Sequence, residues 1–97
     1  RSGEALGLGA LETRYYLRMT VLDQPGVLAQ IARVLGEAQV SIAAVDQRES
    51  DEERGTAELA LMTHRARELA VTGAIDTLRG LDEVSEVDAM LRVEGAT

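Results

Sequence analysis

Residues 16–47 decide the fold and read YLRMTVLDQPGVLAQIARVLGEAQVSIAAVDQ. The apolar residues Leu17, Met19 and Val21 alternate with other side chains, a period of two that is typical of a half-buried strand. The tetrapeptide at 23–26 then ends the strand, because its proline cannot donate a hydrogen bond to a neighbouring strand. Apolar residues at helical spacing follow, and the stretch ends in small and β-branched residues. It therefore predicts a strand, a turn, a helix and a second strand.

The rest of the chain carries the same two periodicities. Alternation over 56–64 and 84–93 predicts two more strands, and an apolar stripe over 68–79 predicts a second helix. The acidic run at 49–55 is interpreted as a solvated turn that joins two strands in a hairpin. The predicted elements are a strand from residue 15, a helix at 26–38, strands at 40–48 and 56–64, a helix at 68–79 and a strand at 84–93.

This order of elements predicts an α+β fold of the ferredoxin-like βαββαβ type. Both helices need to cover apolar sheet surface, so we expect them on one face of a four-stranded antiparallel sheet. Right-handed crossovers place the first and third strands in the centre and leave the second and fourth at the edges. The second strand carries Val40, Ile42 and Val45 without a Lys or Pro to discourage pairing. We therefore expect a homodimer, or a higher homo-oligomer, formed through that edge.

Composition excludes several classes of function. The chain has 97 residues and a net charge of −7, which suits one compact domain and not a complete two-domain enzyme. It has no Cys and one His, so a thiolate or histidine metal site is not expected. Without Lys, Phe or Trp it lacks the charges and the stacking rings that nucleic acids require. No apolar run approaches the roughly 20 residues that span a membrane, so a cytoplasmic protein is predicted.

The amino-terminal residues differ in character from the rest. Residues 1–14 contain three Gly and no sustained period, and they are interpreted as a linker or a disordered tail before a domain at 15–95. The chain starts at Arg1 and not at Met, which suggests a piece of a larger protein. His64 is the only side chain that ordinarily titrates near neutrality, and no nucleophile and base stand together, so no catalytic residues are expected.

The turn at 23–26 is the best candidate for binding. It places the backbone N–H groups of Gly26, Val27 and Leu28 at the start of a helix, where the helix dipole favours an anion such as a carboxylate. Alternatively, Asp23 only caps the helix and Pro25 only starts it. The binding interpretation needs an adjacent chain that completes a pocket with the groups around its second strand. These groups are Ser41, Ile42 and Gln47.

Three segments resemble a known family. The run at 16–47, the segment LALMTHRARE at 59–68 and the ending VDAMLRVEG at 87–95 resemble the ACT domain, a small amino-acid-sensing regulatory module. More particularly, they resemble the ACT domain at the carboxyl end of homoserine dehydrogenases. The resemblance covers residues 15–95. One departure concerns 38–41, which read AQVS, where many ACT effector sites have an Asn.

The resemblance implies an amino-acid effector, threonine, bound between the turn of one copy and the second strand of another. The effector's carboxylate is then expected against Gly26, Val27 and Leu28. Its ammonium and hydroxyl groups are expected near Asp23 or Gln24 of one copy and Ser41, Ile42 and Gln47 of the other. The resemblance also implies NAD(P) for the parent enzyme, whereas this chain itself should bind no cofactor and carry no catalysis. The alternatives are an ACT domain of another amino-acid enzyme, such as aspartate kinase or phosphoglycerate dehydrogenase, and a purely structural dimerisation module.

Overall fold

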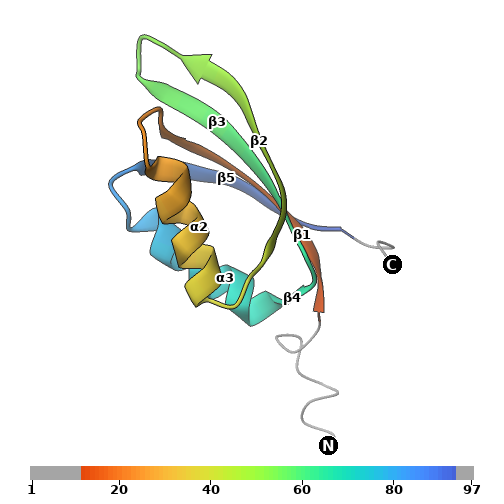
Figure 1. The fold of residues 1–97 in the computed structure, drawn as a ribbon. Coiled ribbons are helices and arrows are strands. Elements are labelled where there is room, and N and C mark those ends of the chain that lie inside the picture. The colour runs from red at the N-terminus through yellow and green to blue at the C-terminus, as the bar shows by residue number, and fades with distance from the viewer. Residues whose placement is uncertain (1–11, 94–97) are drawn as a thin grey trace, which may run out of the picture.

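The computed structural model describes residues 12–93 and confirms the ferredoxin-like βαββαβ architecture (Figure 1). Two helices lie on one face of an antiparallel sheet, and the hairpin of the second and third strands extends beyond them. The elements are β1 (Glu12–Leu22), α2 (Val27–Glu37), β2 (Ile42–Asp51), β3 (Thr56–Thr63), β4 (Ala66–Arg67), α3 (Glu68–Arg79) and β5 (Val84–Val93).

The sheet has the strand order β2-β3-β1-β5, with the short β4 beside the start of β1. All of these pairings are antiparallel, as the registers Tyr16↔Met62 between β1 and β3 and Tyr16↔Leu91 between β1 and β5 illustrate. The long strands β1 and β3 are therefore central, and β2 and β5 form the edges, as the crossover rule predicts.

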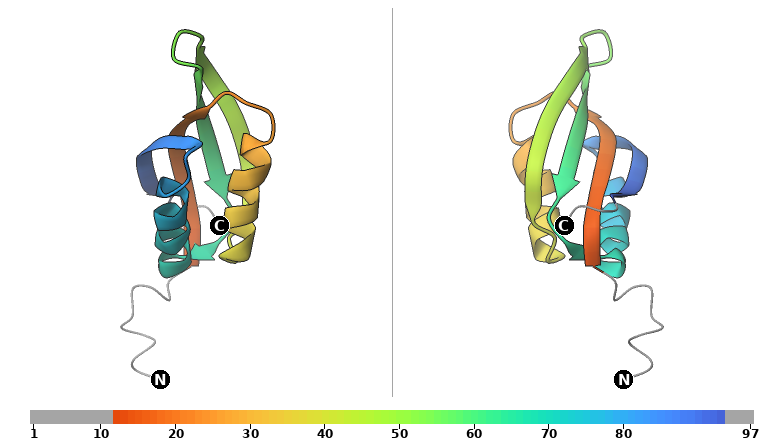
Figure 2. Two further views of the ribbon diagram at one scale, coloured as in Figure 1. Left: turned by 90° about the vertical axis from the view of Figure 1, so that its left-hand side faces the viewer. Right: turned by 90° about the vertical axis from the view of Figure 1, so that its right-hand side faces the viewer.

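The core lies between the helices and one face of the sheet (Figure 2). Alternate residues of β1 are buried there, and each fully buried aliphatic side chain contributes roughly 1.5–3 kcal/mol. Helix α2 buries one stripe of apolar residues and α3 another. The buried side chains of these three elements are Tyr15, Leu17, Met19 and Val21 of β1, Val27, Ile31 and Leu35 of α2, and Val71, Ala74, Ile75 and Leu78 of α3.

The first strand begins earlier than the sequence predicts. Residues 12–14, which the sequence interpretation assigned to a linker, form the start of β1, while 1–11 lie outside the described residues. Glu12 and Thr13 pair with Arg67 and Ala66 of β4. A strand of two residues has no measurable period, so β4 was not predicted, and neither was the part of β1 that pairs with it.

The predicted bounds of the second strand are also wrong. β2 starts at Ile42 and not at Val40, and it continues through the first acidic residues to Asp51. Val40 is buried, and its backbone N–H donates to the Leu35 carbonyl at 2.8 Å. The preceding Gln39 has a φ of 67° and donates to the Gly36 carbonyl at 3.0 Å. These two bonds form a Schellman motif, so Val40 ends the helix and does not begin the strand.

Candidate functional site

The turn that precedes α2 is a type II turn over residues 24–27. Pro25 takes its second position, and Gly26 takes its third with φ 87° and ψ −11°, a conformation that favours Gly. The Val27 N–H closes the turn on the Gln24 carbonyl at 3.4 Å. Gly26 is the N-cap, and no side chain caps the helix. The capping role considered for Asp23 is therefore wrong, and so is the role of Pro25 as the first helical residue.

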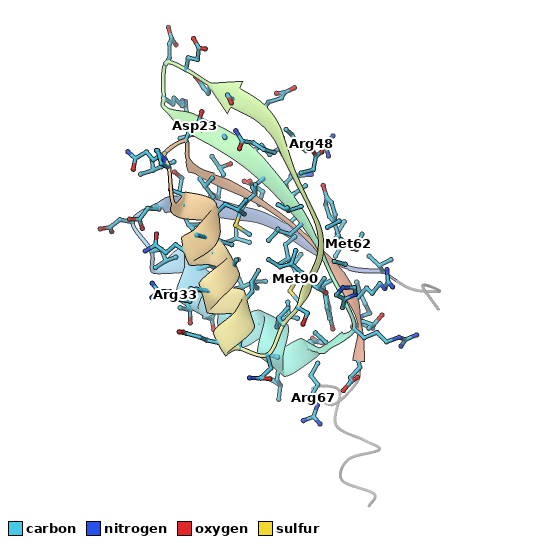
Figure 3. The ribbon with its side chains drawn as sticks, viewed as in Figure 1. Asp23, Arg33, Arg48, Met62, Arg67 and Met90 are labelled. Carbon is cyan, nitrogen blue, oxygen red and sulfur yellow. The ribbon has the colours of Figure 1, made fainter. Side chains whose placement is uncertain are left out.

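Asp23 instead contacts the hairpin. Its backbone N–H donates to the Gly55 carbonyl at 2.8 Å, which ties the turn to the end of the sheet where β2 meets β3. Figure 3 shows Asp23 beside the hairpin and above α2. The sequence pattern places Asp23 three residues before the N-cap, and only the N-cap side chain reaches the first helical amides.

The start of α2 retains the properties of an anion site. The first intrahelical bond runs from the Gln30 N–H to the Gly26 carbonyl at 3.1 Å, so the amides of Leu28 and Ala29 have no partner within the helix, whereas the Val27 amide already closes the turn. The first turn carries no acidic residue that would neutralise the helix dipole. Gly26 and Leu28 are exposed, whereas the Val27 side chain is buried and fixes the turn on the core.

The second group of predicted site residues, Ser41 and Ile42, lies at the end of the sheet opposite to the turn at 23–26. The Ser41 carbonyl accepts a hydrogen bond from the His64 N–H at 2.9 Å, and Ile42 pairs with Thr63. Asp23 contacts Gly55, which precedes the other end of β3. The eight residues of β3 separate these ends by roughly 25 Å at 3.3 Å per residue. One chain therefore does not bring Ser41 and Ile42 to the turn at 23–26.

The strand β2 carries two of the predicted site residues, Ile42 and Gln47, and is almost entirely exposed. Gln47 lies near its middle, opposite Leu59 of β3. Val45 is 44% exposed, and only Ile42 is partly buried. A hollow of about 190 Å³ beside Ala44 and Val45 opens on the sheet face away from the helices, between Tyr16 and Met62. Among the described residues no strand pairs with the outer edge of β2.

The segment at 63–68 is a structural junction that sequence patterns did not reveal. The Thr63 hydroxyl accepts a hydrogen bond from the Tyr15 N–H at 3.0 Å, and Ala66 pairs with Thr13. Glu68 faces Arg92 at 3.6 Å. These contacts hold the ends of three strands and a helix together.

The Tyr15 hydroxyl belongs to the same junction. Burial raises the pKa of this hydroxyl above its ordinary value, and the nearby Glu68 carboxylate raises it further. Arg92 opposes both effects through its charge and a hydrogen bond. The cluster therefore keeps Tyr15 neutral and stabilises the packing of α3 on the sheet.

Two larger hollows lie away from the turn. One, of about 590 Å³, is lined by residues of the α2 end and the β4 segment, among them Gln39, Arg67 and Leu69. The other, of about 570 Å³, lies along the acidic hairpin. Within residues 12–93 no three His, Cys, Asp or Glu side chains are grouped as metal ligands. No helix in that range is long and apolar enough to cross a membrane.

Comparison with known proteins identifies the family. The ACT domain model matches residues 15–83. Homoserine dehydrogenase from Pseudomonas aeruginosa is 40% identical over 89 residues, which cover 92% of this chain and 20% of that protein. The Mycobacterium bovis homoserine dehydrogenase is 40% identical over 91 residues, covering 91% of this chain and 21% of that protein.

A solved structure agrees with these relatives. The crystal structure of a homoserine dehydrogenase from Thiobacillus denitrificans superposes with a TM-score of 0.79 and 37% identity. The match covers 92% of this chain and 19% of that one. The chain thus spans about one fifth of the length of the proteins that it resembles. The residues that the ACT domain model matches, 15–83, include the turn, β2 and the junction at 63–68. The chain belongs to the ACT domain family.

Proposed function

We propose that this chain is the amino-acid-sensing regulatory domain of a homoserine dehydrogenase, and that it binds threonine between two copies paired through β2. The proposal assigns the ligand's carboxylate to the amides of Gly26, Val27 and Leu28. The parent enzyme, with its NAD(P) chemistry, belongs to the proposal and not to this chain.

One observation carries the proposal. The anion-binding turn and the polar start of β2 lie at opposite ends of one chain, as the contacts of Asp23 with Gly55 and of Ser41 with His64 demonstrate. Antiparallel pairing of two β2 strands inverts the second copy, so that its Ser41 and Ile42 approach the first copy's turn. The exposed edge of β2 suits such pairing, because its first four residues are uncharged.

The chemistry of the two halves matches an amino acid. Amides at the start of a helix whose first turn has no acidic residue favour a carboxylate, whereas the Asp23 carboxylate and the side-chain amide of Gln24 offer acceptors to an ammonium group. The Ser41 hydroxyl and the Gln47 amide can exchange hydrogen bonds with a ligand hydroxyl. Threonine carries all three of these groups.

Regulation requires that the effector favours one arrangement of the paired domains over another. An effector that binds both arrangements with equal affinity does not change their populations. Typical coupling free energies between an effector site and a second site are about 1–3 kcal/mol. A structural dimerisation module with an empty site is the second candidate, favoured by the uncharged edge alone. If the chain is only a dimerisation module, it should form a dimer and bind none of the amino acids.

Calorimetric titration of the chain tests the proposal. We expect threonine to bind and valine, its near-isostere without the hydroxyl, to bind much more weakly. Ser41→Ala and Gln47→Ala should weaken threonine binding, and Ser50→Ala, an exposed serine near the far end of β2, serves as the matched control. Absence of heat with all twenty amino acids at millimolar concentration would reject sensing and leave the dimerisation module.

A further inference from the structure

The residues that follow β3 contact two distant parts of the chain. The His64 N–H donates to the carbonyl of Ser41, the residue directly before β2, at 2.9 Å. Two positions later, Ala66 pairs with Thr13 in the first turn of strand β1. Figure 1 shows β4 beside the start of β1, where β3 leads into α3. The three residues 64–66 therefore connect the start of β2 with the start of β1.

The pairing of β4 with β1 is the shortest ladder of the described sheet. It consists of Glu12 with Arg67 and Thr13 with Ala66, whereas β1 pairs with β3 all the way from Tyr16 to Leu22. The ion pair of Arg67 Nε with the Glu12 carboxylate, at 3.8 Å, joins two exposed side chains and stabilises the ladder little. Ladders this short open locally at a low free energy, long before the whole domain unfolds. The β4–β1 ladder thus has two states, paired and open.

The backbone amides of Thr13 and Ala66 distinguish these two states. The Tyr15 N–H points to the Thr63 hydroxyl, on the side of β1 where β3 and β4 lie. Alternate residues of a strand direct their backbone groups to the same side, so the Thr13 N–H points to Ala66. In an antiparallel ladder such a pair exchanges both N–H···O bonds, and both amides lose their partner when the ladder opens.

We propose that the β4–β1 ladder is a latch, made of residues 12–13 and 66–67, that the effector closes through Ser41. This inference rests on the proposed function, and it deepens that function by naming the element that responds to the effector. The closed latch fixes the direction in which the chain before Glu12 joins the domain. In a parent with this domain at its carboxyl end, as the resemblance implies, the catalytic region is joined through that part of the chain.

Ser41 is suited to pass a ligand's effect to the latch. Its side chain is exposed, and it lies between Val40, which ends α2, and Ile42, which begins β2. A ligand that binds the hydroxyl restricts the backbone of Ser41, whose carbonyl then holds the His64 N–H in place. This bond in turn positions Ala66 for its pairing with β1. The latch therefore responds to the ligand that contacts the Ser41 of its own chain.

Thermodynamic linkage makes the latch measurable in two independent ways. If the ligand favours the closed latch by some factor, a chain whose latch cannot close must bind the ligand more weakly by the same factor. Typical couplings between two sites correspond to a factor of about 5–150. The first measurement concerns the latch and the second concerns the ligand, and the proposal requires the two factors to agree.

Hydrogen exchange of the unmodified chain, followed by NMR, measures the first factor. Saturating threonine should slow exchange at the Thr13 and Ala66 amides about fivefold or more. The control amide is that of Gly80, which donates to the Thr77 carbonyl at 3.0 Å at the end of α3 remote from β4. Its exchange rate should not change.

Calorimetry of Thr13→Pro measures the second factor. Proline removes the N–H that points to Ala66, and it is tolerated near the start of a strand. We expect this variant to bind threonine about fivefold or more weakly, in step with the slowing of exchange. Thr13→Val is the matched control, because it keeps the N–H and loses only the hydroxyl that donates to the Val93 carbonyl at 3.1 Å. It should bind threonine like the unmodified chain, and a thermal melt verifies that both variants fold.

The possible outcomes separate the latch from the proposed function. Threonine binding without slower exchange at Thr13 and Ala66 would overturn the latch and leave amino-acid sensing intact. Two unequal factors would overturn it as well, because the coupling would then lie in another element. A chain that binds no threonine would overturn the proposed function and the latch together. If Thr13→Pro does not fold, the exchange rates of the unmodified chain decide alone.

Discussion

The Thr63 hydroxyl oxygen accepts a hydrogen bond from the backbone N–H of Tyr15, 3.0 Å away, at the point where β1 leaves β3 and turns to β4. The last ladder pair of the two long strands is Tyr16 with Met62, so the Thr63 side chain replaces the missing backbone partner. Thr63 is fully buried and is the one buried polar side chain within residues 12–93.

Thr63→Val should therefore destabilise the domain by about 1–3 kcal/mol, because it keeps the shape of the side chain and leaves a buried N–H without a partner. Chemical denaturation measures this difference in unfolding free energy. Thr63→Ser retains the hydroxyl and loses only a methyl group, so it should cost clearly less. Equal losses in the two variants would mean that the methyl packing matters and the hydrogen bond does not.

The raised pKa of the Tyr15 hydroxyl makes the unfolding free energy of the domain depend on pH at high pH. Its pKa in the folded protein is raised, first by burial and then by Glu68, above the value near 10 of an unfolded chain. The difference between the folded and the unfolded pKa of Tyr15 contributes to the unfolding free energy. This contribution is fully present below about pH 10 and is lost as the pH rises through the folded pKa. The sequence has no Lys or Cys, the other side chains that commonly titrate near this pH.

The unfolding free energy should accordingly fall as pH is raised from 9 through about 10 and beyond. Tyr15→Phe should remove much of that fall, and denaturation at a series of pH values tests it. Tyr16→Phe is the matched control, since its ring lies on the sheet face away from the helices. A fall of the same size in Tyr15→Phe would assign the pH dependence to another group.

The residue two positions after the end of α2 has a strained backbone. Gln39 has a φ of 67°, and this left-handed conformation costs a residue with a Cβ roughly 1–2 kcal/mol. Gln39→Gly should raise the unfolding free energy by about 1 kcal/mol, since Gly is the preferred residue at this point of a Schellman motif. Arg33→Gly, at an exposed position in the middle of the same helix, should instead lower it by about 1 kcal/mol.

Sequence patterns predict some elements of this fold and not others. The alternation in β1, β3 and β5 and the stripes of α2 and α3 follow from one buried face per element, so the sequence alone predicts them. The edge strand β2 is exposed on almost every residue, and without a buried face it has no period that fixes its bounds. The turn at 23–26 is recognisable by its proline and glycine. Its distance from Ser41 depends on how the sheet is assembled, which no local pattern records.

Leu28→Glu should change stability and binding in opposite directions. Leu28 is 45% exposed in the first turn of α2, where an acidic side chain interacts favourably with the helix dipole. The unfolding free energy should rise by about 0.3–1 kcal/mol. The new carboxylate would also repel a ligand carboxylate at the same amides, so calorimetry should detect a large loss of threonine affinity. Leu28→Gln supplies the same shape without the charge, and equal losses in both variants would assign the effect to size.

Two defective variants should restore binding when they are mixed. Leu28→Glu damages the turn and leaves the start of β2 intact, whereas Ser41→Ala does the reverse. If each site combines the turn of one copy with Ser41 of the other, a heterodimer of the two variants contains one undamaged site, because both changes fall together in its second site. Mixing the unfolded chains and refolding them should return part of the threonine heat that neither variant gives alone. If the mixture gives only the sum of the two separate titrations, each site is built within a single chain, and the pairing through β2 has no part in binding.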